Sequence, residues 1–146
     1  MTDQYEKELT LTRTFDAPRQ LVWDAHTKPE QLAKWWGPDH FHSPEDKITV
    51  DLRPGGDFKI TMVGPDGTEY PAEMRFEEID PIDSLTYAWD DQRGIPEGKT
   101  TVTLTEEDGK TKLVQHYVGN ATDEIFPMME QGTNEQLDKL GKLLEG

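Results

Sequence analysis

The side chains with the clearest potential for metal or acid–base chemistry are the four histidines of this 146-residue chain. His40 and His42 are one residue apart, with Asp39 and Glu45 nearby, and two imidazoles with a carboxylate can hold a metal ion. The pair falls in a polar segment that offers no firmly placed third ligand, a pattern more typical of a surface loop. We therefore expect no metal site.

His116 could act as a general acid or base near neutral pH if it faced a cavity. It lies in a stretch where Leu113, Gln115 and Tyr117 alternate along one strand face, so His116 belongs to the opposite face. The sequence has no cysteine and no Gly-x-Ser-x-Gly motif, and its Gly-Gly pair lacks the lysine and helix of a phosphate-binding loop. These observations predict no catalytic residue and no cofactor, and they favour a binding protein over an enzyme.

Aromatic side chains are better candidates for function. Trp and Tyr combine a large apolar body with a hydrogen-bonding group, and ligand sites are mostly apolar with a few placed polar groups. We interpret Trp23 as plain core packing. Five other side chains are expected to line a pocket: Trp36, Tyr87, Trp89, Gln115 and Tyr117.

These residues must be positioned by a larger element, and the stretch from about Asn120 to Gly146 is the best candidate for a long helix, with Asn120 or Thr122 as its cap. Its apolar residues recur at the three- and four-residue spacing of one helix face: Ile125, Met129, Leu137, Leu140 and Leu144. The stripe is interrupted at Gly132, Thr133 and Gln136. The pattern predicts a helix that closes a core at its two ends and leaves space at its middle.

The rest of the chain predicts a sheet for this helix to cover. A strand over residues 8–15 is followed by two short helices, each opened by a proline, and then by six strands between residues 48 and 118. Short turns, such as the one at Asp108-Gly109, make these strands an antiparallel meander. We therefore predict one α+β domain, residues 1–146, in which a curved sheet of six or seven strands surrounds the C-terminal helix.

The composition narrows the choice of partners. Thirty acidic residues against fifteen basic ones give a formal net charge of −15. This charge repels nucleic-acid phosphates and anionic lipid headgroups, so we expect neither nucleic acid nor a membrane as partner. The lack of cysteine, the polar N-terminal segment and the lack of a long apolar span predict a cytoplasmic protein. The acidity is explained either by a well-solvated surface or by adaptation to a salty cytoplasm.

Several motifs, in order along the chain, resemble those of one superfamily. They are Phe15-Asp16-Ala17-Pro18, residues 21–25, residues 29–38, residues 51–58, residues 64–71, and Ile79-Asp80-Pro81 with Leu85-Thr86-Tyr87. The chain resembles the SRPBCC superfamily of START and birch-pollen-allergen-like proteins. More narrowly, it resembles the branch homologous to the C-terminal domain of the heat-shock-protein-90 ATPase activator (AHSA-type). The resemblance implies a helix-grip fold with a cavity between sheet and helix, but relatives differ in activity.

Two departures from this branch concern the expected cavity. Where the branch usually carries a Gly-Trp pair in the C-terminal helix, this chain has Gly132 followed by Thr133. In the strand before that helix, Gln115 takes the place of a cavity-facing leucine. Both changes predict a larger or more polar cavity than is usual in the branch. Met129, Gly132, Thr133 and Gln136 therefore join the five residues above as the predicted ligand-binding set.

Three functions are compatible with these features. We favour a small cytoplasmic binding protein that holds a hydrophobic or amphipathic small molecule between sheet and helix. The first alternative is an enzyme of the polyketide cyclase or hydrolase kind, using Gln115, Tyr87 or His116. The second is a partner-binding module, for example for a chaperone. A homodimer through the sheet edge or the helical end is compatible with all three.

Overall fold

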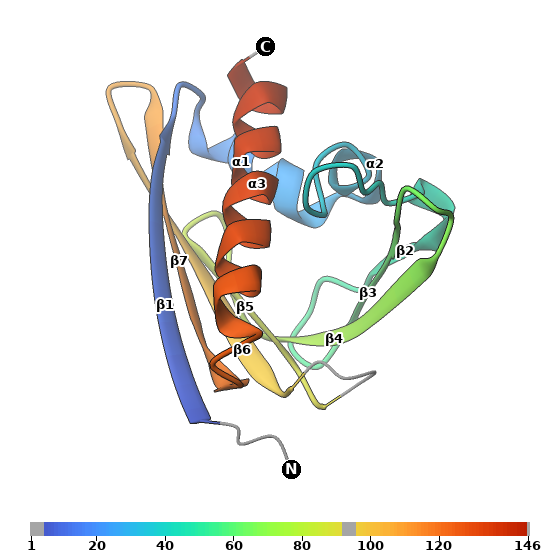
Figure 1. Ribbon diagram of the computed structural model, residues 1–146. Coiled ribbons are helices and arrows are strands. Elements are labelled where there is room, and N and C mark those ends of the chain that lie inside the picture. The colour runs from blue at the N-terminus through green and yellow to red at the C-terminus, as the bar shows by residue number, and fades with distance from the viewer. Residues whose placement is uncertain (1–4, 92–95, 146) are drawn as a thin grey trace.

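The computed structural model describes residues 5–91 and 96–145 of the chain. Its elements confirm the α+β prediction, since a strand, two short helices, six strands and a long helix follow one another (Figure 1). The elements are β1 (Tyr5–Phe15), α1 (Arg19–Thr27), α2 (Pro29–Leu32), the 3-10 helix η1 (Glu45–Lys47), β2 (Ile48–Val50), β3 (Asp57–Val63), β4 (Glu69–Asp80), β5 (Ser84–Trp89), β6 (Gly98–Glu107), β7 (Lys110–Ala121) and α3 (Phe126–Glu145).

All seven strands form one antiparallel sheet in the order β1-β7-β6-β5-β4-β3-β2. Strands β2 to β7 are a meander, and β1 completes the sheet by pairing with β7 along its whole length. The β6–β7 hairpin turns at Asp108 and Gly109, whose φ angles are 54° and 78°. Two successive positive φ angles are what a tight two-residue hairpin requires, so the turn predicted at this dipeptide is confirmed.

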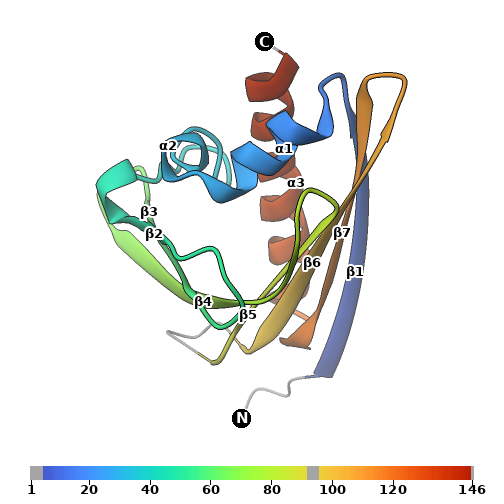
Figure 2. The same ribbon diagram turned by 180° about the vertical axis from the view of Figure 1, so that it is seen from behind.

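The sheet curves around α3, as Figures 1 and 2 show from opposite sides. The helices α1 and α2 lie at the end of the sheet where α3 finishes, level with the C-terminal half of that helix. A curved antiparallel sheet closed by one long helix is the helix-grip architecture, and this prediction is confirmed.

A cluster of fully buried side chains lies where α1, α2 and the second half of α3 meet the sheet. Trp35 is 1% exposed, and its indole Nε1–H donates a hydrogen bond to the Ala25 carbonyl at 2.8 Å. Trp23 is buried in the same cluster, as expected. The fully buried side chains of this cluster include Val22, Leu32, Phe58, Phe76, Leu113, Leu137 and Leu140.

The long helix begins later than the sequence pattern predicts. The expected start near Asn120 is wrong, because β7 continues to Ala121, where it still pairs with Tyr5 of β1. Of the two expected caps, Thr122 is confirmed: its hydroxyl accepts a hydrogen bond from the backbone N–H of Ile125 at 3.0 Å and so caps the turn that leads into α3. The strand β7 extends to Ala121 because it pairs with β1, more than a hundred residues away in the sequence. The local sequence pattern does not indicate this pairing.

The expectation that α3 closes a core at both ends is also wrong. Leu137 and Leu140 are fully buried, whereas residues 126–136 include no buried side chain. Met128, in the first turn, is 71% exposed. Only the second half of α3 therefore belongs to the packed core.

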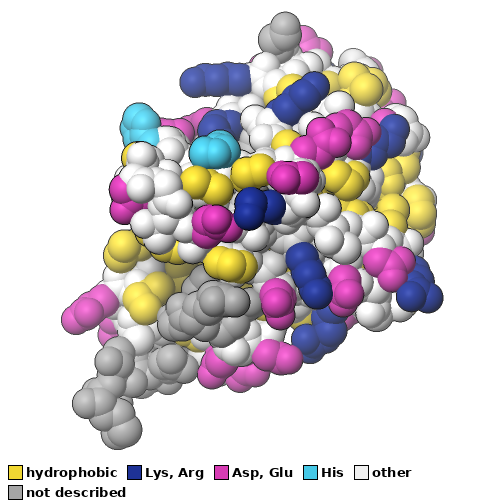
Figure 3. Space-filling view, turned by 90° about the vertical axis from the view of Figure 1, so that its right-hand side faces the viewer, with side chains coloured by type: hydrophobic (Ala, Val, Ile, Leu, Met, Phe, Trp, Pro, Cys, Tyr) yellow, Lys and Arg dark blue, Asp and Glu magenta, His cyan; other side chains and the backbone are white. Residues whose placement is uncertain are grey.

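The outer surface carries charged side chains of both signs, and Figure 3 shows acidic and basic groups intermixed over one face. Across the described residues, no helix combines the length and apolar character needed to cross a membrane.

Candidate ligand-binding pocket

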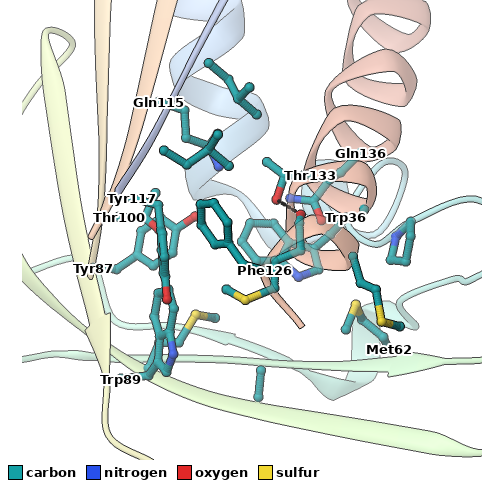
Figure 4. Close-up of a pocket in the computed structure, with 18 residues that line it drawn as sticks. Trp36, Met62, Tyr87, Trp89, Thr100, Gln115, Tyr117, Phe126, Thr133 and Gln136 are labelled. Atoms are coloured by element: carbon teal, nitrogen blue, oxygen red, sulfur yellow. Dashed lines mark hydrogen bonds between the residues drawn. The ribbon is translucent and has the colours of Figure 1, made fainter. Parts of the chain in front are cut away.

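A pocket of about 320 Å³ lies between the first half of α3 and the sheet. Eighteen residues line it, drawn from the loop after α2, from every strand except β2, and from α3 (Figure 4). All nine residues predicted from the sequence lie in its wall: Trp36, Tyr87, Trp89, Gln115, Tyr117, Met129, Gly132, Thr133 and Gln136. The fold thus brings these residues together in space, while their role in binding stays a prediction.

One wall of the pocket is a row of four aromatic rings. The ring centroids of Trp36 and Tyr87 are 6.1 Å apart, those of Tyr87 and Trp89 are 6.2 Å apart, and those of Trp89 and Tyr117 are 6.0 Å apart. The angles between successive ring planes fall from 55° to 34° and then to 21° along the row. We call these four residues the aromatic wall. Their tilted and offset contacts are the arrangements that aromatic pairs favour.

Two glycines lie beside the Trp89 and Tyr117 rings of the aromatic wall. Gly98 of β6 pairs with Trp89 on one side and with Gly119 of β7 on the other. A Cβ atom at Gly98 would lie 2.8 Å from ring atoms of both Trp89 and Tyr117. One at Gly119 would lie 2.6 Å from the Glu97 carbonyl oxygen and 2.7 Å from the Tyr117 hydroxyl. These separations are too short for a side chain, so Gly98 is required by the two rings, and Gly119 by the neighbouring backbone as well as by Tyr117.

The opposite wall is the first half of α3, where short side chains interrupt the apolar stripe. The Thr133 hydroxyl donates a hydrogen bond to the Met129 carbonyl at 2.8 Å, so its proton is used within the helix. The Oε1 atom of Gln136 accepts a hydrogen bond from the backbone N–H of Gly37 at 2.9 Å and ties the helix to the loop after α2. A Cβ atom added at Gly132 would meet only Pro38, at 3.7 Å.

None of the eighteen lining residues carries a charged side chain. Burial raises the pKa of Tyr87 well above its usual value, against the opposite effect of its hydrogen bond with Thr100. Burial also raises the pKa of Tyr117. Both phenols therefore stay protonated around neutral pH, and the pocket offers hydrogen bonds without net charge.

Three polar groups in the pocket wall have no hydrogen-bond partner among the described residues. They are the side-chain amide of Gln115, the indole N–H of Trp36 and the –NH₂ group of Gln136, whose Oε1 already accepts from Gly37. In Figure 4 Gln115 comes from the strand side, whereas Gln136 comes from the helix. These groups are available to a molecule in the pocket.

Half of the lining was not predicted from the sequence: Leu9, Leu11, Pro38, Met62, Ala72, Met74, Thr100, Phe126 and Met128. Strand alternation could have indicated Met62 and Met74, which share faces with buried residues of β3 and β4. Thr100 lies opposite Tyr87 only through the β5–β6 register. Phe126 and Met128 lie within the predicted helix but outside the apolar stripe chosen for it, which used Ile125 and Met129. Four of the five methionines of the chain line the pocket.

The histidines lie elsewhere. The Nε2 atom of His116 is 2.6 Å from a carboxylate oxygen of Glu8, and both side chains are open to solvent, so the predicted outward orientation is confirmed. His42 forms an isolated backbone bridge with Val63. The residues that the structure describes contain no group of three or more His, Cys, Asp or Glu side chains placed to hold a metal ion.

The sequence as a whole matches one protein family. A family model described as Activator of Hsp90 ATPase homolog 1-like protein aligns with residues 16–145. The chain belongs to this family. The AHSA-type resemblance inferred from the motifs is thereby confirmed. No curated protein matches this AHSA1-like chain.

Solved structures share the AHSA1-like fold along nearly the whole chain. A protein from Chromobacterium violaceum is 28% identical, with a TM-score of 0.84, over 95% of this chain and 97% of that protein. A protein from Nitrosomonas europaea is 26% identical, with a TM-score of 0.82, over 94% and 93%. The AHSA1 protein from Silicibacter pomeroyi is 26% identical, with a TM-score of 0.80, over 94% and 97%.

Proposed function

We propose that this AHSA1-like protein is a cytoplasmic binding protein that holds a hydrophobic or amphipathic small molecule between α3 and the sheet. The observation that carries the proposal is the unfilled volume of about 320 Å³ beside the aromatic wall. Pockets that bind small ligands span roughly 300–1,000 Å³ and are mostly apolar with a few polar groups, which describes this pocket.

The pocket is a local feature, because the neighbouring core is tightly packed. Phe58 and Phe76 stack with their ring centroids 4.9 Å apart and are almost completely buried. Phe58 also meets Trp36 edge to face, at 5.5 Å, so the aromatic wall rests on a rigid base. A ligand in the pocket would complete the packing on the open side of a wall that the core already fixes on the other side.

The enzyme alternative receives less support from this geometry. His116 lies on the outer face beside Glu8, and the raised pKa of Tyr87 keeps its phenol protonated. General acid–base catalysis works best with a group whose pKa lies near the operating pH. Gln115 faces the pocket but does not titrate. None of the three residues that the enzyme alternative invoked is therefore well suited to proton transfer in the pocket.

Mass spectrometry of the purified native protein tests the proposal. We expect a chain mass with a non-covalent adduct that denaturation releases, and a higher melting temperature when the released compound is returned. A ligand at a hundred times its Kd should stabilise the fold by about 2.7 kcal/mol. A chain mass without adduct, together with an unchanged melting temperature across a library of lipids and aromatic compounds, would contradict the proposal.

A further inference from the structure

The pocket differs in charge from the chain that surrounds it. Charged residues make up 31% of the sequence, yet none of the eighteen lining residues is charged. An ionised group without a partner costs several kcal/mol to move out of water. The net charge of −15 adds long-range repulsion against an approaching anion. The lining and the overall charge together disfavour carboxylate, sulfonate and phosphate ligands.

The aromatic wall favours a flat, aromatic ligand. Its four rings follow one another with successive centroids no more than 6.2 Å apart, and the planes of Trp89 and Tyr117 differ by only 21°, so this pair offers the flattest part of the wall. A cation is held best by ring faces turned towards it from several sides, whereas these four rings follow one another along one wall of the pocket. The four methionines of the lining can adapt to the edges and faces of an aromatic guest, because thioether sulfur is polarisable and the side chain is flexible.

The unpartnered polar groups add a preference for a hydrogen-bond acceptor. The indole N–H of Trp36 and the –NH₂ group of Gln136 are both donors, and both residues line the pocket. The backbone N–H of Gly37, the residue after Trp36, donates to Gln136 Oε1. A donor left unpaired when water is displaced costs about 1–3 kcal/mol. A ligand that brings an oxygen acceptor to either donor avoids that cost.

We propose that the ligand is an uncharged, flat aromatic molecule with a hydrogen-bond acceptor. It stacks on the aromatic wall and accepts a hydrogen bond from the indole N–H of Trp36 or the –NH₂ group of Gln136. This inference rests on the proposed function and specifies the ligand class of the same pocket.

A pair of fluorescent probes that differ only in one charge tests the preference for neutral ligands. N-phenyl-1-naphthylamine is neutral, and 1-anilinonaphthalene-8-sulfonate is the same molecule with a sulfonate. We expect the neutral probe to bind the wild-type protein with a Kd at least tenfold lower. Comparable or tighter binding of the sulfonate would overturn the ligand class while leaving the pocket as a binding site. Binding of neither probe would count against both proposals. Tightest binding of a naphthylmethyl-trimethylammonium probe would also overturn the ligand class.

A second pair of compounds tests whether the pocket prefers a ligand with a hydrogen-bond acceptor. In displacement of N-phenyl-1-naphthylamine, 2-acetylnaphthalene should compete at least fivefold better than 2-ethylnaphthalene, although the acetyl compound is the less hydrophobic of the two. The Gln136→Glu variant keeps an oxygen for the Gly37 N–H but replaces the donor with a carboxylate oxygen, so it should reduce this preference.

The matched control is Gln131→Glu, which adds the same charge on the exposed side of α3 and should leave the preference intact. Equal competition by the two naphthalenes in the wild-type protein would contradict the proposal that the ligand carries a hydrogen-bond acceptor. This measurement does not depend on whether a variant folds.

Discussion

The first half of α3, residues 126–136, and the second half, residues 137–145, belong to one helix but have different surroundings. Leu137 and Leu140 are fully buried among the side chains of α1, α2 and the sheet. In the first half no side chain is buried, and its inner face borders the pocket. The same helix therefore contributes to stability at one end and to a candidate binding site at the other.

Polar contacts at the border between the halves hold the helix in place. Gln136 accepts from the Gly37 N–H, and the Lys139 ammonium donates to the carbonyls of Pro38 and Phe41, each at 3.3 Å. Burial lowers the pKa of Lys139, and the nearby carboxylates of Asp39 and Glu135 oppose that change. Because the position of the helix is set at this border, residues of the first half can serve ligand contacts. Binding surfaces are commonly drawn from such less stable segments.

The largest expected difference between the halves is in core substitutions. Leu140→Ala should lower the free energy of unfolding by about 2–5 kcal/mol, because it leaves a cavity in a fully buried site. Met129→Ala, in the half-buried first half, should cost below about 1 kcal/mol without ligand. Urea unfolding of both variants measures the contrast, and equal losses would show that both halves belong to one core.

The stability contributed by the packed end should also depend on pH. His26 is buried in α1, its Nδ1 contacts the Val22 carbonyl at 2.9 Å, and its Nε2 is buried without a hydrogen-bond partner. Burial lowers the pKa of His26 from 6.5 to about 4, despite the opposing effect of the Val22 contact. Between these two values the unfolded chain binds a proton that the folded chain excludes, so stability is full above about pH 6.5 and falls as the pH drops.

The loss assigned to His26 by pH 4 is about 3 kcal/mol. Many carboxylates titrate in the same window, so the measurement compares wild type with His26→Phe. Denaturant unfolding at a series of pH values should show a shallower acid decline in the variant. Parallel pH curves for the two proteins would contradict the account of this end of the molecule.

In the first half, a large side chain should affect binding more than folding. Thr133→Trp places an indole in the pocket and should weaken binding of N-phenyl-1-naphthylamine at least tenfold, with a thermal unfolding transition retained. Gln131→Trp, on the exposed side of the same helix turn, is the control and should bind as the wild type does. Unchanged binding by Thr133→Trp would place the site elsewhere.

The smallest effect is expected at the neighbouring glycine. Alanine favours a helix over glycine by about 1 kcal/mol, and a Cβ atom at Gly132 would meet only Pro38 at an ordinary distance. Gly132→Ala should therefore raise the free energy of unfolding by up to about 1 kcal/mol while narrowing the pocket slightly. A loss of stability, measured by the same urea titration, would show that this turn is packed more tightly than the pocket implies.

Sequence reasoning succeeded where the signal was local. The strand alternation around Gln115 and Tyr117 and the apolar spacing of Leu137 and Leu140 gave the sheet, the helix and the inward faces. It failed where the cause was a distant partner. The length of β7 depends on pairing with β1, and the need for glycine at position 98 depends on rings from β5 and β7. No local pattern could have shown either.

Hydrogen exchange along α3, with and without N-phenyl-1-naphthylamine, tests the central contrast most directly. We expect the amides of residues 130–136 to exchange faster than those of residues 137–145 in the free protein. The probe should slow exchange in the first group and leave the second nearly unchanged. Equal exchange in both halves, with no change on adding the probe, would contradict the division of this helix into a core end and a pocket end.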